Sequence, residues 1–172
     1  MGPSFDAAFA DEFPTLHRYL ARRVGATAAD DLAAETFAVA FRNWDRLDPA
    51  RAVRPWLYGI AANLMRHHWR KERRMLRAYA RTGLDPVVAE DDEAVARADA
   101  GVRRRELSEM LAALSRGERE ILLLHAWAGL TDTEIAEALG LPLGTMKSRF
   151  SRTREKLRNQ LGDVGQEAVE AS

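Results

Sequence analysis

Apolar side chains recur along most of the chain every three or four residues, the spacing that places them on one face of an α-helix. This spacing predicts a first helix over residues 5–24, which Gly25 ends, and a second from about 28 to 47, ended by Asp48-Pro49. A third helix begins near Pro55, a residue suited to the first helical turn. The expected inward positions are Phe5, Phe9, Phe13, Leu16, Leu20 and Val24; then Leu32, Thr36, Phe37, Ala40, Phe41, Trp44 and Leu47; then Leu57, Ile60, Ala61, Leu64 and His68.

The C-terminal part contains shorter helices with clear boundaries. Residues 115–118 and 131–134 each fit a capping box, in which a Ser or Thr and a Glu satisfy free amides at a helix start. Gly129 and Gly140 are expected to end helices, because glycine tolerates the left-handed backbone that follows a helix. A last helix is predicted from about 143 to 161.

The fold class is predicted to be all-α, because no stretch alternates convincingly between apolar and polar residues. Residues 82–102 contain one Arg against six Asp and Glu, a net charge of −5, with Gly and Pro at the start. Such a segment predicts a flexible linker. The expected architecture is two small helical domains joined by an acidic flexible linker. Its expected parts are a first domain at 1–81, the linker at 82–103, a second domain at 104–161 and an acidic tail at 162–172.

Charge and composition narrow the classes of function. Residues 1–81 hold 14 Lys and Arg against 9 Asp and Glu (+5), and residues 103–161 hold 11 against 8 (+3). Two basic blocks fit two modules that bind a polyanion, and they also fit ordinary surface charge. The chain has no cysteine, which excludes disulfides and thiolate zinc sites. No signal peptide and no apolar run of about 20 residues is visible, so a cytoplasmic protein without a membrane partner is expected.

The last two predicted helices have the pattern of a helix-turn-helix: a short capped helix, a turn at 140–142 and a longer basic helix. Residues placed at 100° intervals put Met146, Phe150, Thr153 and Leu157 inward. The opposite face is small, polar and cationic, which suits the reading of base edges in the major groove. A solvated helix in a bundle is the alternative. The candidate DNA-binding residues are Gly144, Thr145, Lys147, Ser148, Arg149, Ser151, Arg152 and Arg154.

The third helix combines cations with aromatic side chains. Arginines recur at helical spacing from Arg66 to Arg81, as expected for a helix that follows a phosphate chain. Trp56, Tyr58 and Trp69 add stacking surfaces, and single-strand binding uses both features. Core packing is the alternative for Trp56.

Three segments resemble one family. Residues 129–149 look like region four of extracytoplasmic-function sigma factors, in the sigma-70 superfamily of bacterial RNA polymerase initiation factors. Residues 30–44 and 55–74 are similar to the clamp-binding and minus-ten-reading helices of region two. The resemblance implies a sigma factor that directs RNA polymerase core to promoters. The helix-turn-helix would read the minus-35 element, and the N-terminal domain the melted minus-ten element.

The resemblance also implies partners and site residues. The partners are the β′ clamp helices and β flap of core polymerase, promoter DNA and an anti-sigma factor, with a monomer when free. In the implied minus-ten site, Asn63 lines the pocket for a flipped base, with Leu47 and loop 48–54 as its wall; for Asn63 a helix-surface amide is the alternative. Ala34 and His67 stand where the family often has Gln and Asp. The implied clamp contacts are Asp31, Leu32, Glu35 and Thr36, and the implied minus-ten contacts are Leu47, Trp56, Asn63, Arg66, Arg70, Arg73 and Arg74.

Other classes of function fit less well. The runner-up is a helix-turn-helix transcriptional regulator with a helical sensing domain. Asp31 and Glu35, one turn apart, suggest acid/base or metal chemistry, but no third ligand is evident. His67 and His68 point about 100° apart on a helix and do not converge on a metal. We therefore expect no catalytic residues, no metal, no cofactor and no enzyme activity.

Overall fold

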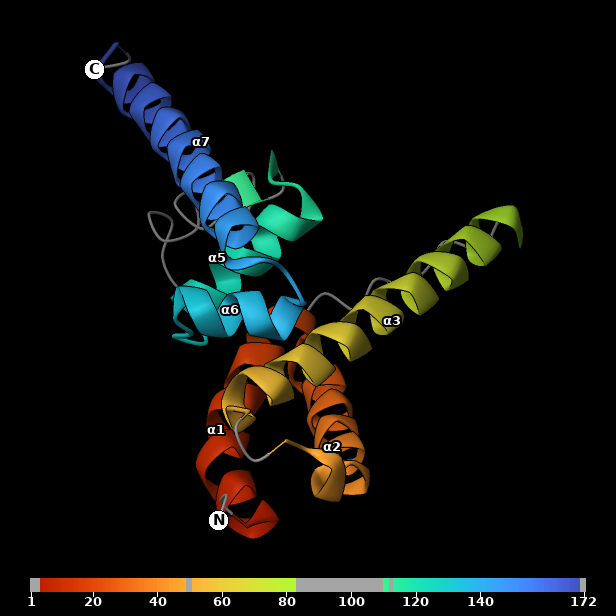
Figure 1. Cartoon of the computed structure of the whole chain (residues 1–172). Helices are drawn as coiled ribbons and strands as arrows, with labels where there is room; N and C mark the ends of the chain where they lie inside the picture. Colours follow the sequence, from red (N-terminus) through yellow and green to blue (C-terminus); the bar gives the residue numbers. More distant parts are fainter. Residues whose placement is uncertain (1–3, 49–50, 83–109, 112, 171–172) are drawn as a thin grey trace. The chain divides into compact units, whose positions relative to one another are not determined.

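The computed structural model describes residues 4–48, 51–82, 110–111 and 113–170. Every regular element in these residues is helical, which confirms the all-α prediction (Figure 1). The chain divides into two compact units, one with the first four elements and the other with α5, α7 and most of α6. The predicted linker lies almost wholly outside the described residues. The elements are α1 (Phe5–Val24), α2 (Ala26–Arg42), the 3₁₀ turn η1 (Trp44–Arg46), α3 (Val53–Thr82), α5 (Arg116–Ala126), α6 (Asp132–Leu139) and α7 (Leu143–Glu170).

The N-terminal unit is built around α2, which packs against both α1 and α3. Ser4 caps α1, because its hydroxyl accepts from the amide of Ala7 at 3.2 Å. In Figure 1, α3 extends well beyond its two partner helices. The buried residues described in α3 lie between Pro55 and Met65, in its N-terminal half. The fully buried large residues of this unit are Leu16, Tyr19, Leu20, Thr36, Leu57, Tyr58 and Met65.

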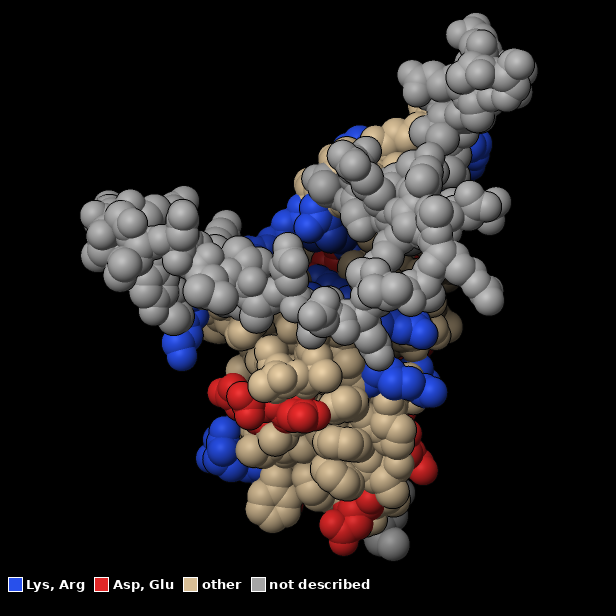
Figure 2. All heavy atoms as spheres, turned by 180° about the vertical axis from the view of Figure 1, so that it is seen from behind, with Lys and Arg blue, Asp and Glu red and all other residues tan. Residues whose placement is uncertain are grey.

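Aromatic rings join the start of α1 to the end of α2. The rings of Phe9 and Phe37 lie 4.8 Å apart, and those of Phe5 and Phe41 lie 5.0 Å apart, both edge to face. Phe37 is buried as predicted, whereas Phe41 is 66% exposed and Phe9 is 40% exposed, so the inward positions predicted for these two rings are wrong. A helical wheel places Phe41 beside Phe37 but does not show where the neighbouring helices stop. The lower end of the view in Figure 2, where α1 begins, is largely uncharged.

Several helix ends differ from the predicted ones. The second helix stops at Arg42 instead of 47, because the Asn43 side chain donates from Nδ2 to the Val39 carbonyl at 2.8 Å and η1 follows. The third begins at Val53, which still leaves Pro55 in the first turn. The last runs to Glu170, past the predicted end at 161. The predicted acidic tail is thus mostly helical.

The C-terminal unit contains the two predicted capping boxes and the predicted glycine turn. Ser115 and Glu118 form a capping box at the start of α5. Thr131 and Glu134 form a second one before α6, since the Thr131 amide donates to Glu134 at 2.8 Å. Gly140 has a φ of 63°, the left-handed backbone that lets the chain turn sharply between α6 and α7. The core of the unit contains Ile121, Leu124, Leu130, Ile135, Met146 and Phe150.

Candidate nucleic-acid interface

The first turns of α7 present one buried face and one polar face. Met146 and Thr153 are fully buried and Phe150 is 8% exposed, so the predicted inward phase of this helix is confirmed. Leu157 is half-buried. The predicted reading residues lie on the other side, and all except the half-buried Thr145 are exposed: Gly144, Lys147, Ser148, Arg149, Ser151, Arg152 and Arg154. An exposed face of small residues and cations is what close approach to a DNA groove requires.

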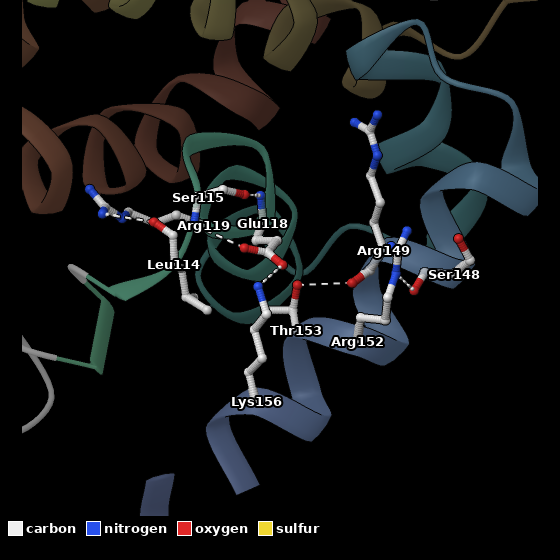
Figure 3. A network of polar contacts seen from close by, with 9 residues as sticks. All are labelled: Leu114, Ser115, Glu118, Arg119, Ser148, Arg149, Arg152, Thr153 and Lys156. Atoms are coloured by element: carbon white, nitrogen blue, oxygen red, sulfur yellow. Dashed lines mark hydrogen bonds and ion pairs between the residues drawn. The ribbon is translucent and has the colours of Figure 1, made fainter. Parts of the chain in front are cut away.

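The arginines of α7 differ in what they contact. Arg152 folds along the helix, with its Nε donating to the Ser148 carbonyl at 3.3 Å. The Arg154 guanidinium lies over the Phe150 ring, 5.1 Å from its centroid, which holds it towards the packed side of the helix. The Arg149 guanidinium lies beside the first turn of α5, with Nη1 3.8 Å from where a Cβ atom on Gly117 would stand; Figure 3 shows Arg149 with the polar contacts that join α7 to α5. Arg152 is therefore placed on the polar face, and Arg154 at its margin.

One ion pair fixes α7 against α5. The Lys156 ammonium lies 2.6 Å from Oε1 of Glu118, whose other oxygen accepts from the Ser115 amide at 2.9 Å (Figure 3). The hydrogen bond from Lys156 and the two bonds with Ser115 lower the pKa of Glu118 to about 2. The same carboxylate thus completes the capping box of α5 and ties that helix to α7. The sequence predicted the cap but not the ion pair, because Lys156 lies 38 residues from Glu118 along the chain.

The exposed side of α3 carries the predicted cations. Arg66, Arg70 and Arg74 are exposed, and the latter two donate back to backbone carbonyls one turn earlier. These bonds lay the guanidinium groups along the helix. The side chain of Arg73 lies outside the described part of the chain. A row of exposed guanidinium groups suits the phosphates of a strand that follows the helix.

The aromatic residues near α3 are less available than predicted. Tyr58 is fully buried against the Tyr19 ring, 5.4 Å away, and burial raises the pKa of Tyr58 to about 12. Its predicted role as a stacking surface is therefore wrong. Trp69 is half-buried, with the Arg23 guanidinium 4.9 Å from its ring. Trp56 is also half-buried, beside the Trp44 ring at 6.0 Å. Trp56 also lines a hollow.

That hollow has a volume of about 350 Å³ and opens where α2 ends. Leu47 of the predicted wall lines it, as does the predicted minus-ten contact Trp56, but Asn63 does not; Asn63 is exposed and accepts a hydrogen bond from Arg66. Residues 49–50 of the predicted wall lie outside the described residues. Sequence reasoning missed Asn43, because the second helix was predicted to run past it to residue 47, whereas α2 ends at Arg42. The lining residues are Val39, Asn43, Arg46, Leu47, Asp48, Arg51, Trp56 and Ile60.

Only half of the predicted clamp-contact set lies on the surface. Asp31 and Glu35 are exposed one turn apart on α2. Leu32 is 6% exposed, and Thr36 is fully buried with its hydroxyl donating to the Leu32 carbonyl at 2.6 Å. Direct contact of Leu32 and Thr36 with a partner is therefore not available in this structure. Their role is to pack α2 so that the two acids face outward.

The two exposed acids border a groove between α2 and α3 of about 620 Å³. Its α2 side carries the carboxylates, and its α3 side carries His67, His68, Lys71 and Arg74. The groove thus joins the acidic face of one helix to the basic face of the other. Within the described residues, no group of three or more His, Asp or Glu is arranged to hold a metal. No described helix has the length and apolar character needed to cross a bilayer.

Comparison with known proteins covers both units. Residues 9–75 match the family "Sigma-70 region 2", and residues 104–157 match "Sigma-70, region 4". RNA polymerase sigma factor CarQ of Myxococcus xanthus is 33% identical over 94% of this chain and 91% of its own length. ECF RNA polymerase sigma factor SigW of Bacillus subtilis is 33% identical over 79% of this chain and 76% of its own length. The solved structure of CnrH in complex with the cytosolic domain of CnrY is similar at a TM-score of 0.65 and 26% identity, covering 92% of this chain and 88% of that one.

Proposed function

Because this chain belongs to the extracytoplasmic-function group of the sigma-70 family, we propose that it directs RNA polymerase core to promoters. The observation that carries the proposal is the presence of both regions in one chain. Each region has a packed core and a separate exposed polar face. A protein that acts in this way positions an enzyme and needs no catalytic group of its own. Its place of action is the cytoplasm, where polymerase and DNA are found.

The C-terminal unit is assigned to the minus-35 element. Its α7 face has the small and cationic side chains that reach base edges, and Gly144 allows close approach of the backbone. Arg152 reads a base edge, while Arg154 and Arg149 meet phosphates. The β flap of polymerase is the expected surface that holds this unit.

The N-terminal unit is assigned two roles on adjoining helices. Asp31 and Glu35 on α2 pair with basic residues of the β′ clamp helices. Arg66, Arg70 and Arg74 on α3 hold the phosphates of the melted minus-ten strand, and Trp56 offers a surface for an unstacked base. Core binding and strand capture thus use opposite sides of the groove between the two helices.

A protein inhibitor is the remaining expected partner. The similar CnrH structure holds the cytosolic domain of a second protein, CnrY. For this chain we propose an anti-sigma factor that occupies the same polar faces and keeps the free protein inactive. In the absence of that partner we expect a monomer, because two different modules on one chain read two promoter elements without dimerisation.

The proposal is tested by transcription in vitro. Purified chain is mixed with bacterial core polymerase and genomic DNA fragments, and transcripts are mapped at their 5′ ends. We expect co-purification with core and transcripts that begin at a small set of sites absent with core alone. A chain that binds DNA fragments but neither co-purifies with core nor creates new start sites is a regulator, and the proposal then fails.

A further inference from the structure

The hollow at the end of α2 contains a means of selecting a base by its hydrogen-bonding edge. We infer that Asn43 reads one unstacked base of the minus-ten strand and selects adenine or cytosine, the bases that carry an amino group where guanine and thymine carry the O6 or O4 carbonyl oxygen. The inference rests on the proposed function, because it presumes that a melted strand passes over α3. It adds a specificity-determining residue that the sequence did not indicate.

The end of the helix holds the Asn43 amide in one orientation. Nδ2 donates to the carbonyl oxygen of Val39 at 2.8 Å. Turning the amide over would set Oδ1 against that carbonyl oxygen, and two acceptors form no hydrogen bond. The Val39 carbonyl belongs to the last turn of α2, where carbonyls lack a partner further along the helix. The bond therefore fixes the amide, and Oδ1 is the atom that an entering group meets as an acceptor.

The walls around Asn43 suit a flat aromatic ring. Trp56 is half-buried and supported by the ring of Trp44, so a base has a held surface on which to stack. Val39 and Ile60 add apolar lining. The volume of about 350 Å³ lies at the lower end of the roughly 300–1,000 Å³ found for small-ligand pockets. The hollow therefore fits one base and not an extended ligand.

The Asn43 acceptor separates the bases into two classes. Adenine and cytosine present an amino donor at the edge position where guanine and thymine present a carbonyl oxygen. A carbonyl oxygen placed against Oδ1 of Asn43 leaves that acceptor unpaired, which costs affinity. Arg46 is exposed at the same hollow, where its guanidinium group suits a flanking phosphate.

The test uses holoenzyme assembled from the full chain and core polymerase. The probe is a pool of forked DNAs whose single-stranded non-template segment is randomised through the minus-ten region, and the bound fraction is sequenced. We expect one position enriched in adenine or cytosine by roughly 2- to 10-fold over guanine and thymine, the range of one net hydrogen bond. Asn43→Ala abolishes that preference and leaves the other positions unchanged. Asn43→Asp keeps it, because an acceptor remains.

Base analogues sharpen the result. Purine in place of adenine, or 2-pyrimidinone in place of cytosine, lacks the amino group and should weaken binding of the wild type but not of Asn43→Ala. Both Asn43 variants lose the hydrogen bond to Val39. A folding defect would therefore lower DNA binding by both variants alike, and it would not produce a difference in base preference between them.

Three results overturn the inference while the proposed function stands: preference for guanine or thymine at the responding position, loss of preference in Asn63→Ala but not in Asn43→Ala, or no change in either. If the wild-type holoenzyme shows no base preference anywhere in the single-stranded segment, the minus-ten assignment fails and the inference falls with it.

Discussion

The two units hold their exposed faces in different ways. In the C-terminal unit, α7 packs Met146 and Phe150 into a small core, and two capping boxes, a glycine turn and the Lys156–Glu118 ion pair fix the ends and contacts of its helices. In the N-terminal unit, the faces of α2 and α3 are placed by a packed core of aromatic and aliphatic residues. A rigid helix with a regular row of side chains suits duplex DNA, whose groove is itself regular. A hollow between a helix end and an aromatic ring suits a strand whose bases are separated.

The two units also differ in the charge of their exposed faces. The C-terminal unit presents cations on one helix face, whereas the N-terminal unit presents acids on α2 and cations on α3 across one groove. A face with one sign of charge serves one kind of partner. In the proposed function, the two faces of opposite sign serve two partners at once, a basic protein surface and a polyanion. The changes below test this division, from the largest expected effect to the smallest.

Reversal of charge at the α2 face should abolish binding to core polymerase. Asp31→Lys with Glu35→Lys replaces two exposed acids by like charges facing a basic partner, at an expected cost of ~2–5 kcal/mol or more. Binding is measured by titration of labelled protein with core, and helical content by circular dichroism. Asp11→Lys with Asp45→Lys makes the same charge change at other exposed sites and should bind normally. Equal binding of core polymerase by both double variants would show that the acids of α2 are not part of the clamp interface.

Removal of the Phe150 ring should destabilise one unit alone. Phe150→Ala empties a buried position, and we expect a loss of ~3–5 kcal/mol in the C-terminal unit. Hydrogen exchange on the full chain should show faster exchange in α5 and α7 while α1 and α2 keep their protection. The matched control is Leu143→Ala, at a 39% exposed position, which should change little. A parallel loss of protection in both units would show that they do not fold independently.

Two arginines of α7 should separate base reading from phosphate contact. Arg152→Ala should cost ~1–3 kcal/mol at one minus-35 base pair and relax the preference there. Arg154→Ala should weaken all promoters about equally and reduce the salt slope by about 1. A panel of single-base promoter variants, measured with holoenzyme at several salt concentrations, gives both readouts. The opposite pattern would mean that the reading face has to be redrawn around the Arg154 side of the helix.

The Glu118 carboxylate should make the C-terminal unit sensitive to acid. Its pKa is about 2 in the folded protein and about 4.5 otherwise, so its stabilising effect is present above pH 4.5 and is lost as pH falls towards 2. Glu118→Gln should lower stability near neutral pH by ~0.5–2 kcal/mol, the range for a lost cap, and remove this acid dependence. Denaturant unfolding monitored at α5 and α7 between pH 6 and pH 3 measures both. A variant with the wild-type slope would assign the acid sensitivity to another group.

The two units also differ in how far the sequence predicts them. The buried positions of α7 were predicted correctly, because caps and Gly140 set where the helix begins and therefore its phase. In α3 the buried face includes Tyr58 and Met65, which lie beside the predicted stripe. Tyr58 was interpreted as a stacking surface because it occurs with Trp56 and Trp69 beside the row of arginines. Its contact with Tyr19, on another helix, is long-range information that no local pattern carries.

The candidate sites also depend on burial and contacts that no local sequence pattern reveals. The apolar stripe placed Leu32 and Thr36 inward, which the structure confirms, while the family resemblance placed them in the clamp contact. Leu32 and Thr36 are buried in the structure, so Asp31 and Glu35 are the two residues of this set that lie on the surface. Asn43 was missed because its importance depends on a side chain turned back to Val39, and that depends on where α2 ends.

The central claim is that two weak DNA-binding modules act together only on polymerase. The most direct measurement is the affinity of the full chain for one mapped promoter fragment at physiological salt, with and without core. We expect the free chain to bind no more tightly than non-specific binding, with a Kd of roughly 10⁻⁴–10⁻⁶ M and steep salt dependence, and the holoenzyme to bind orders of magnitude more tightly. Nanomolar binding by the free chain, unchanged by core polymerase, would contradict the account and identify a regulator instead.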